Sequence, residues 1–346
     1  PVTWVAIQTM LPATARLRPN ALAGPREGNG WTMANDSRLD DAARAGWLYY
    51  VAGNTQDQIA AKLGVSRQSA QRLVSLAVSE GLVKVHIDHP IAQCLDLARR
   101  LVERFGLKHC EVVPTDPAST STTLGVAQAA AAEIERWLRR QQPIVMAIGT
   151  GRTLKAAIEL LPRLECRQHK VVSLTGNIAP DGSAAYYNVI FTMADKVTAR
   201  SFPMPLPVIA SSQAERDTLH QQPMIRSTLA LAGQANVTFV GVGDLGDEAP
   251  LYLDGFISRE ELEALQRAGA VGEMVGWAFD AEGRLIEGIT NGRVTSSPIP
   301  DRGTSLVIAI AKGRLKLPGI AAAIRGGLIN GLITDEATAT ELLGKS

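Results

Sequence analysis

The chain has 346 residues, a length typical of two domains of ordinary size. Hydrophobic residues make up 46% of it and charged residues 20%, which is the composition of a globular protein that can bury a sizeable core. The 35 basic and 34 acidic residues leave a net charge of +1, which excludes a strongly basic protein that coats nucleic acid. Aromatic residues are only 5%, whereas alanine and glycine are abundant, and this favours a helix-rich α/β protein.

The cysteines and histidines give no sign of a metal site or a disulfide framework. Cys94, Cys110 and Cys166 are widely spaced and form no CxxC pair, as expected for a protein of a reducing cytoplasm. His86 and His89 form an HxxH pattern, but no cluster of cysteines or carboxylates accompanies them, and we interpret them as part of a solvated linker. We therefore predict no metal and no cofactor. No run of about 18 apolar residues is present, so no membrane-spanning helix is expected.

Residues 1–35 are predicted to be a disordered N-terminal extension. Their first 32 residues contain four prolines and show neither a helical nor an alternating hydrophobic period. A short apolar run over residues 2–11 is not preceded by a basic segment or followed by an A-x-A site, which argues against a secretory signal.

Residues 36–88 are predicted to form a helix-turn-helix domain. Its three helices are expected over about 36–53, 56–63 and 67–79, and a short strand over 82–87. Thr55 and Ser66 are the expected N-caps of the second and third helices. Gly64 supplies the positive φ that the turn needs, and Ala60 is small enough for the two helices to cross closely. The apolar side chains expected between the helices are Ile59, Leu63, Val65, Ala70 and Leu73.

The third helix carries a donor-rich surface that is predicted to bind operator DNA. Between residues 58 and 79 there are three basic side chains and no acidic one, although the wider segment 36–88 is neutral. Arginine and glutamine on such a helix can reach base edges in the major groove, while Lys62 is better placed for a phosphate. The predicted contacts are Lys62, Ser66, Arg67, Gln68, Ser69, Gln71 and Arg72. A three-helix module that contacts another protein is the alternative.

Residues 89–346 are predicted to form one α/β domain. Strands are expected over 110–114, 144–148, 170–174, 197–199, 237–240 and 306–311. Helices are expected over 91–105, 122–140, 153–161, 211–220, 224–235, 259–268 and 317–325. Apolar strands separated by helices indicate a mostly parallel sheet covered on both faces, as in Rossmann-like folds.

The strand over 144–148 leads into a glycine-rich turn that can bind an anion. The residues of this turn are Gly149, Thr150, Gly151, Arg152 and Thr153. Its glycines let backbone N–H groups face an anion, and the following helix adds the positive end of its dipole. It is neither a P-loop, since the Lys-Ser/Thr ending is missing, nor a dinucleotide fingerprint, since Leu154 replaces the third glycine. An ordinary βα turn without a ligand is the alternative.

Further polar groups follow the neighbouring strands. Thr175, Gly176 and Asn177 form a second expected turn at the same edge of the sheet. Residues 241–246 match G-x-G-x-x-G, but Pro250 follows too soon for the helix that NAD binding needs.

Three charged residues complete the candidate ligand site. Asp244 and Glu273 could accept hydrogen bonds from sugar hydroxyls, and Lys316 could meet a phosphate. Each of the three could instead be an ordinary exposed charge.

From about Leu39 to its end the sequence resembles the SorC/DeoR-type sugar-binding transcriptional regulators of bacteria. The motifs that carry the resemblance are LGVSRQSAQRLVSLAVSEGLV, IGTGRT, FPMPLPVIASS, VTFVGVGDLG, GAVGEMVGWAFDAEG and GLINGLITDEATATELL. The resemblance implies an N-terminal helix-turn-helix and an effector domain similar to the fold of sugar-phosphate isomerases and glucosamine-phosphate deaminases. It also implies a homodimer or homotetramer that binds a sugar, a polyol or a phosphorylated sugar.

Carried onto this sequence, the resemblance makes Gly149–Thr153 the phosphate loop and residues 175–177 the second loop. It turns Asp244 and Glu273 toward sugar hydroxyls and Lys316 toward a phosphate.

The chain departs from this pattern beside Thr175. Members of the family with a sugar-phosphate effector often have an arginine or a second glycine there, where this chain has Asn177 and Ile178.

The sequence thus predicts a cytoplasmic transcriptional regulator, a repressor of a carbohydrate or polyol catabolic operon, and not an enzyme. The alternative is a sugar-phosphate isomerase or deaminase that carries a DNA-binding segment. Asp244, Glu273 and Lys316 include the residue types that such chemistry needs, but no histidine lies in the candidate loops.

Overall fold

The structure, a computed structural model of the whole chain, describes residues 31–83, 91–115, 121–179, 181–183 and 189–344. The chain divides into two compact units, Pro1–Ile87 and Asp88–Ser346, each with its own hydrophobic core. Residues 1–30, the HxxH histidines and most of the strand expected over 82–87 lie outside the described residues. Among the described helices, none has both the length and the apolar character that crossing a membrane requires.

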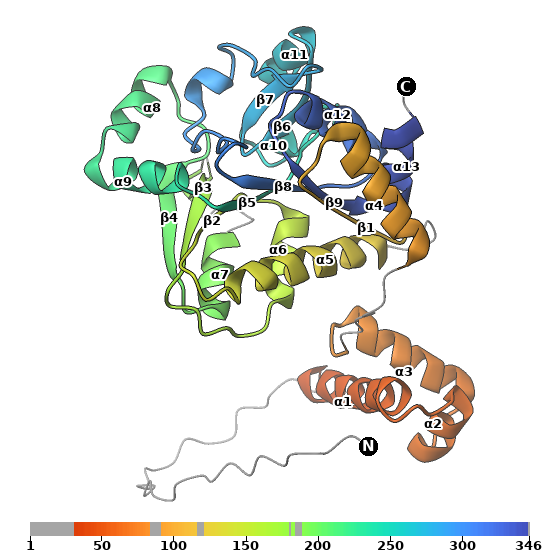
Figure 1. Cartoon of the computed structure of the whole chain (residues 1–346). Helices are drawn as coiled ribbons and strands as arrows, with labels where there is room; N and C mark the ends of the chain where they lie inside the picture. The colour runs from red at the N-terminus through yellow and green to blue at the C-terminus, as the bar shows by residue number, and fades with distance from the viewer. Residues whose placement is uncertain (1–30, 84–90, 116–120, 180, 184–188, 345–346) are drawn as a thin grey trace, which may run out of the picture. The chain divides into compact units, whose positions relative to one another are not determined.

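The N-terminal unit consists of three helices, α1 (Trp31–Tyr50), α2 (Gln56–Leu63) and α3 (Arg67–Ser79) (Figure 1). The bounds of α2 and α3 are those predicted. Residues 31–35, which were expected to be disordered, instead form the start of α1. The last proline of the N-terminal segment is Pro25, and residues 31–45 contain neither proline nor glycine, the two residues that most disfavour a helix.

Local signals fix where α2 and α3 begin. Thr55 Oγ1 accepts a hydrogen bond from Gln58 N at 3.3 Å, and Thr55 N donates to Gln58 Oε1 at 2.8 Å, which closes a capping box. Ser66 Oγ accepts from Ser69 N at 3.1 Å. Gly64, at φ 66°, ends α2 in the left-handed conformation. The core of the unit is built by Ala45, Ile59, Ala60, Ala70 and Val74, with Leu48, Leu63, Val65 and Leu73 packed against them.

The C-terminal unit is built on a seven-stranded parallel sheet. In spatial order its strands are β1 (His109–Val113), β9 (Gly331–Asp335), β8 (Leu306–Ile310), β5 (Val237–Val240), β2 (Val145–Ile148), β3 (Lys170–Ile178) and β4 (Arg200–Pro207). Every pair of neighbours in this sheet is parallel. The predicted parallel, Rossmann-like sheet is therefore confirmed.

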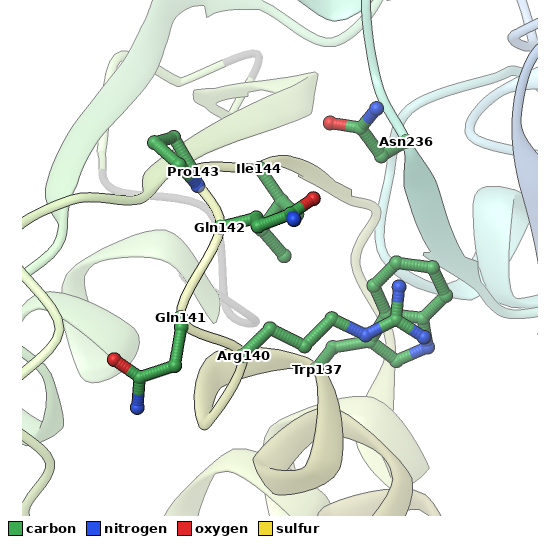
Figure 2. A pocket seen from close by; sticks show the side chains of 7 residues that line it. All are labelled: Trp137, Arg140, Gln141, Gln142, Pro143, Ile144 and Asn236. Atoms are coloured by element: carbon green, nitrogen blue, oxygen red, sulfur yellow. The ribbon is translucent and has the colours of Figure 1, made fainter.

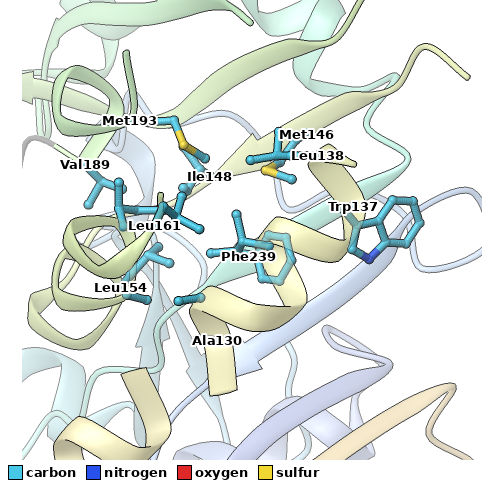
Figure 3. Close-up of a cluster of buried hydrophobic side chains, with 14 of the residues drawn as sticks. Ala130, Trp137, Leu138, Met146, Ile148, Leu154, Leu161, Val189, Met193 and Phe239 are labelled. Atoms are coloured by element: carbon cyan, nitrogen blue, oxygen red, sulfur yellow. The ribbon is translucent and has the colours of Figure 1, made fainter. Parts of the chain in front are cut away.

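Helices cover both faces of the sheet, as the apolar strands predicted. One face packs against α5 (Ser121–Leu138), α6 (Arg152–Leu160) and α7 (Val189–Lys196) (Figure 3). The other face packs against α4 (Ala92–Phe105), α9 (Pro223–Ala232), α12 (Leu317–Arg325) and α13 (Glu336–Gly344). Alternate residues of one strand point to opposite faces, so Met146 and Ile148 belong to the first core and Ala147 to the second.

A smaller substructure lies beyond β5. It contains α10 (Pro250–Leu253), α11 (Arg259–Arg267) and an antiparallel hairpin of β6 (Ala270–Met274) and β7 (Trp277–Asp280). Its core includes Leu251, Leu262, Leu265 and Ala278. A short helix does begin at Pro250, because proline is tolerated at the first position of a helix. The exposed helix α8 (Gln213–His220) precedes α9.

The region around β4 differs from the prediction. Residues 197–199 are not a strand: Val197 makes only an isolated bridge with Leu164, and the strand begins at Arg200. Its sequence, RSFPMPLP, contains three prolines, which cannot donate to a sheet. β4 lies at the edge of the sheet, where a missing N–H on the outer side is tolerated.

Thr175, Gly176 and Asn177 belong to β3 and do not form the expected turn. The pairing of β3 with β4 shifts register at Gly176, where a Cβ would lie 2.5 Å from the carbonyl oxygens of both Leu206 and Pro207. Only a glycine lets the two strands continue so close together. In addition, α7, α13, β6, β7 and β9 were not predicted from the sequence.

Candidate functional site

The carboxyl ends of β2, β3, β5 and β8 border a cavity of about 270 Å³. Doubly wound sheets bind their ligands at this edge, where loops from neighbouring strands converge. Eight residues predicted from the sequence lie on the cavity wall: Thr150, Gly151, Arg152, Thr153, Thr175, Gly176, Glu273 and Lys316. The fold thus brings together positions that are spread from residue 150 to residue 316.

The loop between β2 and α6 places the start of a helix on the cavity wall. Gly151 is the N-cap of α6 with φ 132°, a conformation that glycine adopts without strain. Arg152 and Thr153 form the first turn of the helix, so its positive dipole end and its free N–H groups lie beside the cavity. Gly149 N donates to the Phe239 carbonyl at 2.8 Å, which anchors the loop to β5. The loop can therefore hold an anion.

Glu273 is held at the cavity by a glycine-lined contact. Its backbone exchanges two hydrogen bonds with Gly243, with N···O distances of 3.0 and 2.9 Å. Its Oε2 accepts from Gly276 N at 2.9 Å. A Cβ on Gly243 would lie 2.1 Å from Glu273 Oε1, so any other residue there would displace the carboxylate. Glu273 therefore lies on strand β6 with a fixed orientation and is not an ordinary exposed charge.

Burial shifts the pKa values of Glu273 and Lys316. Although part of the Glu273 side chain is accessible from the cavity, desolvation raises the pKa of its carboxyl above the usual value, and the hydrogen bond from Gly276 N and the charge of Lys316 only partly offset this. Desolvation lowers the pKa of the Lys316 ammonium, which Glu273 and Asp244 oppose. The charged form of each group is therefore disfavoured by desolvation. A ligand with complementary charge and hydrogen bonds would reduce this free-energy cost.

Replacing Glu273 with glutamine is expected to stabilise the ligand-free protein at neutral pH. The raised pKa of Glu273 means that the folded state favours the protonated carboxyl. This contribution to the free energy of unfolding is fully present below the unfolded pKa of about 4.5 and is lost as the pH rises through the folded pKa. The neutral glutamine avoids this loss. The Tm of the Glu273→Gln variant should exceed that of the wild type near pH 7, and the difference should shrink as pH falls toward about 4. A difference in Tm that does not change with pH would contradict this explanation.

Three predicted residues do not lie on the cavity wall. Gly149 packs behind the loop, where a Cβ would lie 3.0 Å from Val275. Asn177 is half-buried in β3. Asp244 accepts a hydrogen bond from Gly246 N at 3.3 Å, and it acts on Glu273 and Lys316 only through its charge.

The sequence missed several residues of the wall, including Thr123, Val208, Asp254, Phe256 and Lys312. Lys312 follows β8 closely, as Thr150 follows β2, so a polar residue after an apolar strand was a usable signal. Asp254 and Phe256 come from the segment after α10, for which no local pattern indicated a site.

The candidate DNA surface lies on α3 and the turn before it. Six of the seven predicted contacts are exposed: Lys62, Ser66, Arg67, Gln68, Gln71 and Arg72. Lys62 donates to Asn54 Oδ1 at 2.6 Å, while Ser69 is half-buried and lies 2.9 Å from the Ser66 hydroxyl. The surface therefore presents exposed hydrogen-bond donors along one helix and the turn before it.

Asp57 modifies this surface. Arg67 Nε lies 3.4 Å from Asp57 Oδ1, and both side chains are about 70% exposed. Such a surface ion pair contributes about 0–1 kcal/mol, so a phosphate or a base can replace Asp57 as the partner of Arg67. Arg72 makes no ion pair with any residue in the described part of the chain.

A second hollow, of about 530 Å³, lies at the opposite edge of the sheet, before β2 and β5 (Figure 2). The guanidinium of Arg140 lies 3.3 Å from the centre of the Trp137 ring, and Asn236 Oδ1 accepts from Val145 N at 2.8 Å. Arg140 and Asn236 therefore already have partners within the protein. The hollow therefore offers a ligand less than the cavity at the carboxyl edge does.

The chain is similar to known bacterial regulators along most of its length. It is 34% identical over 304 residues to the erythritol catabolism regulatory protein EryD of Brucella abortus, covering 88% of this chain and 96% of EryD. It is 31% identical over 309 residues to the transcriptional regulator LsrR of Klebsiella pneumoniae, covering 87% of this chain and 92% of LsrR. The crystal structure of the full-length sorbitol operon regulator SorC from Klebsiella pneumoniae aligns with a TM-score of 0.65 and 25% identity, over 89% of this chain and 99% of SorC.

The profile of the sugar-binding domain family, Sugar-bind, matches residues 89–344. This range contains the sheet, both helix layers and the cavity. Because the match spans well over half of the chain, and because relatives more than 30% identical extend along nearly nine tenths of it, the chain belongs to the family of SorC-type, sugar-binding transcriptional regulators.

Proposed function

We propose that this regulator represses a carbohydrate or polyol catabolic operon and that a small effector bound in the cavity controls its affinity for operator DNA. The cavity is the observation that carries the proposal. A helix N-terminus, three cationic side chains and two carboxylates line it, in a unit distinct from the three-helix unit. Operator DNA as the partner places the protein in the cytoplasm.

For DNA binding we assign base contacts to the exposed face of α3 and a phosphate contact to Lys62. The exposed position of Arg67, Gln68, Gln71 and Arg72 supports the assignment. Ser66 and Ser69, which lie at the start of α3, are proposed to contact the DNA backbone together with the helix N-terminus.

For the effector we propose a polyol or sugar, most simply its monophosphate. Arg152, Lys312 and Lys316 can bind an anionic group, whereas Asp254 and Glu273 can accept hydrogen bonds from hydroxyls. Two of the relatives are named for erythritol and for the sorbitol operon, and both compounds are polyols. Gly149, Asn177 and Asp244 are assigned supporting positions behind the wall.

We further propose that the protein is not an enzyme. The relatives named above are transcriptional regulators. Among the described residues that line the cavity there is neither a histidine nor a cysteine to serve as a base or a nucleophile. Turnover of ribose 5-phosphate or glucosamine 6-phosphate would instead support an isomerase or deaminase.

A gel-shift experiment tests the proposed function. The wild-type protein first selects its DNA site from a random-sequence pool, and the complex is then titrated with erythritol, sorbitol and their monophosphates. We expect at least one of these compounds to release the DNA. Failure to select a site would contradict the DNA-binding role, and a complex that none of them changes would contradict the assigned effector class.

We also expect the protein to act as a homodimer or homotetramer. One helix-turn-helix offers few contacts, so useful affinity usually requires two half-sites bound by two copies. Sedimentation of the full-length protein at micromolar concentration should give the mass of a dimer or a tetramer. A monomer under these conditions would contradict the expectation.

A further inference from the structure

The amino-terminal edge of the sheet carries many basic side chains, which the net charge of +1 conceals. Three stretches of chain lead into this edge: residues 136–145 into β2, 161–170 into β3 and 196–200 into β4. Together they contain eight basic residues and one acidic residue, Glu165. We call this surface the basic edge, and it lies at the opposite end of the strands from the effector cavity. Its basic residues are Arg136, Arg139, Arg140, Arg163, Arg167, Lys170, Lys196 and Arg200.

Hydrogen bonds join the three stretches into one surface. Gln168 Nε2 donates to the Arg140 carbonyl at 3.0 Å, which connects the first stretch to the second. Arg200 N donates to the His169 carbonyl at 3.3 Å, which connects the second to the third. Lys170 and Arg200 are register partners in the parallel pair of β3 and β4, so their backbones lie about 4.8 Å apart and their side chains leave the same face. Charges that are distant in the sequence are therefore neighbours at this edge.

The buried ring of His169 holds the backbone of the basic edge in place. Its Nδ1 accepts a hydrogen bond from Ile144 N at 3.2 Å. Its Nε2 lies 3.0 Å from the Leu138 carbonyl, and it is the donor there because a carbonyl oxygen can only accept. The ring thus ties the end of α5 and the start of β2 to the residue before β3. The basic side chains extend from a backbone that is already ordered, so less conformational freedom is lost when a partner binds.

Most of the charge at the basic edge is not neutralised by the protein itself. Three of the basic residues pair with neighbouring glutamates. The guanidinium of Arg140 stacks on Trp137 (Figure 2), and that of Arg200 lies 5.3 Å from the centre of the Phe202 ring. Stacking uses the face of a guanidinium and leaves the N–H donors at its rim open to an anion. Five of the eight basic residues form no ion pair with any residue in the described part of the chain: Arg140, Arg163, Lys170, Lys196 and Arg200.

The composition of the basic edge fits a nucleic-acid backbone better than a protein partner. Of the large hydrophobic side chains that are exposed among the described residues, none lies in the three stretches. Protein interfaces have an apolar core, whereas interfaces with DNA are polar and positively charged. Six of the eight basic residues are arginines, whose planar donors match the oxygens of a phosphate. These properties favour DNA over an acidic surface of a second copy.

We propose that the basic edge is a second DNA-binding surface, which contacts backbone phosphates and reads no bases. The inference rests on the proposed function, because DNA held by α3 is present at a high effective concentration for the rest of the same chain. Residues 36–88, which include α3, contain six basic and six acidic residues, so that segment has no net charge with which to attract DNA. Phosphate contacts at the basic edge would add affinity for any sequence through the release of counterions.

The test compares the full-length wild type with the double variant Lys170→Gln/Arg200→Gln. The matched control is Arg226→Gln/Arg314→Gln, which removes the same charge from exposed positions on α9 and on the short helix after β8, outside the basic edge. Affinity for the selected DNA site and for a random duplex of the same length is measured by fluorescence anisotropy between about 50 and 200 mM salt. The Tm and the sedimenting mass of each protein are recorded as well.

The edge variant should bind both duplexes about ten-fold more weakly at about 0.1 M salt. The slope of its log affinity against log salt should be shallower by about 1.8, which corresponds to two lost phosphate contacts. The control variant should bind as the wild type does. The exchange Lys170→Arg/Arg200→Lys keeps both charges and should also bind as the wild type does. Because Lys170 and Arg200 are exposed, the Tm of the edge variant should be no lower than that of the wild type.

Each contrary outcome has a distinct meaning. Equal affinity and equal salt slope in the wild type and the edge variant would overturn the inference and leave the role of α3 intact. A wild-type protein that binds neither duplex would contradict the proposed function and, with it, the inference. An equal loss in the control variant would show that total charge governs binding, and a loss in the charge-keeping exchange would show a structural cause. A loss confined to the selected site would indicate base recognition, and a changed sedimenting mass would make a second copy the partner. Any of these last four results would also overturn the inference.

Discussion

Replacing Arg72 with alanine is expected to weaken operator binding about 5- to 150-fold without unfolding the protein. The loss of one good contact to a base costs about 1–3 kcal/mol, and every 1.4 kcal/mol is about ten-fold in affinity. Arg72 is exposed on α3 and makes no ion pair within the described residues, so its guanidinium is available to the major groove. A gel shift with the selected DNA site measures the loss, and circular dichroism checks the fold.

Arg67→Ala should give a smaller loss than Arg72→Ala. In the free protein Arg67 already lies beside Asp57, and this pair must be given up when DNA binds. Arg44→Ala is the matched control, because it removes the same charge from an exposed position on α1. If Arg44→Ala weakens binding as much as Arg72→Ala does, general electrostatics and not the α3 surface carry the affinity. Unchanged binding in both Arg67→Ala and Arg72→Ala would exclude α3 as the recognition helix.

The helices of the N-terminal unit could be predicted from the sequence because each boundary has a local cause. Thr55 and Ser66 cap helices through bonds to residues three positions later, and Gly64 ends α2 by its own backbone conformation. For the start of α1, sequence reasoning gave a boundary that is five residues too late. It placed the boundary at Asp36, where the spacing of the apolar residues becomes helical, whereas α1 begins at Trp31.

The C-terminal unit shows where local reasoning fails. β4 has a sequence with three prolines and becomes a strand only because it lies at the edge of the sheet. β9 has a buried, apolar pattern that was not distinguished from the loops around it, although its pairing with both β1 and β8 makes it central to the fold. Both assignments depend on which strand lies next to which, and no window of neighbouring residues contains that information.

The residues of the cavity wall also differ in whether the sequence alone could identify them. The loop over residues 149–153 could be found because its glycines, its hydroxyls and the following helix are consecutive in the chain. Glu273 was found as a residue type, but its fixed orientation depends on Gly243, thirty residues earlier, and on desolvation that only the folded chain produces. Asp254 was missed because it reaches the wall only through the position of α10, whereas Lys312, just after β8, had a local signal that was not used.

Replacing Lys316 with alanine is expected to abolish most of the response to effector while leaving operator binding intact. Removing a charge-assisted hydrogen bond of about 1.5–3 kcal/mol lowers effector affinity roughly ten- to hundred-fold. A bound anion would raise the lowered pKa of Lys316 again, so the ligand would gain from this group more than the free protein does. Without Lys316, the carboxyl of Glu273 loses the positive charge that partly offsets its burial, and this further disfavours the charged form of the site.

The reason why DNA binding should be spared is thermodynamic as well as structural. A ligand shifts an equilibrium only by the difference between its affinities for the two states, so a variant with weakened binding stays in the effector-free state. Lys316 belongs to the C-terminal unit, and the candidate DNA surface lies in the other. Arg314→Ala is the matched control. Arg314 is an exposed cation on the short 3-10 helix Arg314–Lys316, which also contains Lys316, and it does not line the cavity. Titration of the DNA complex with erythritol 4-phosphate and sorbitol 6-phosphate should dissociate the wild type and the Arg314→Ala variant from the DNA. The Lys316→Ala variant should stay bound. If Lys316→Ala responds as the wild type does, Lys316 contributes no contact to the effector, and the anion must be bound by Arg152 and Lys312.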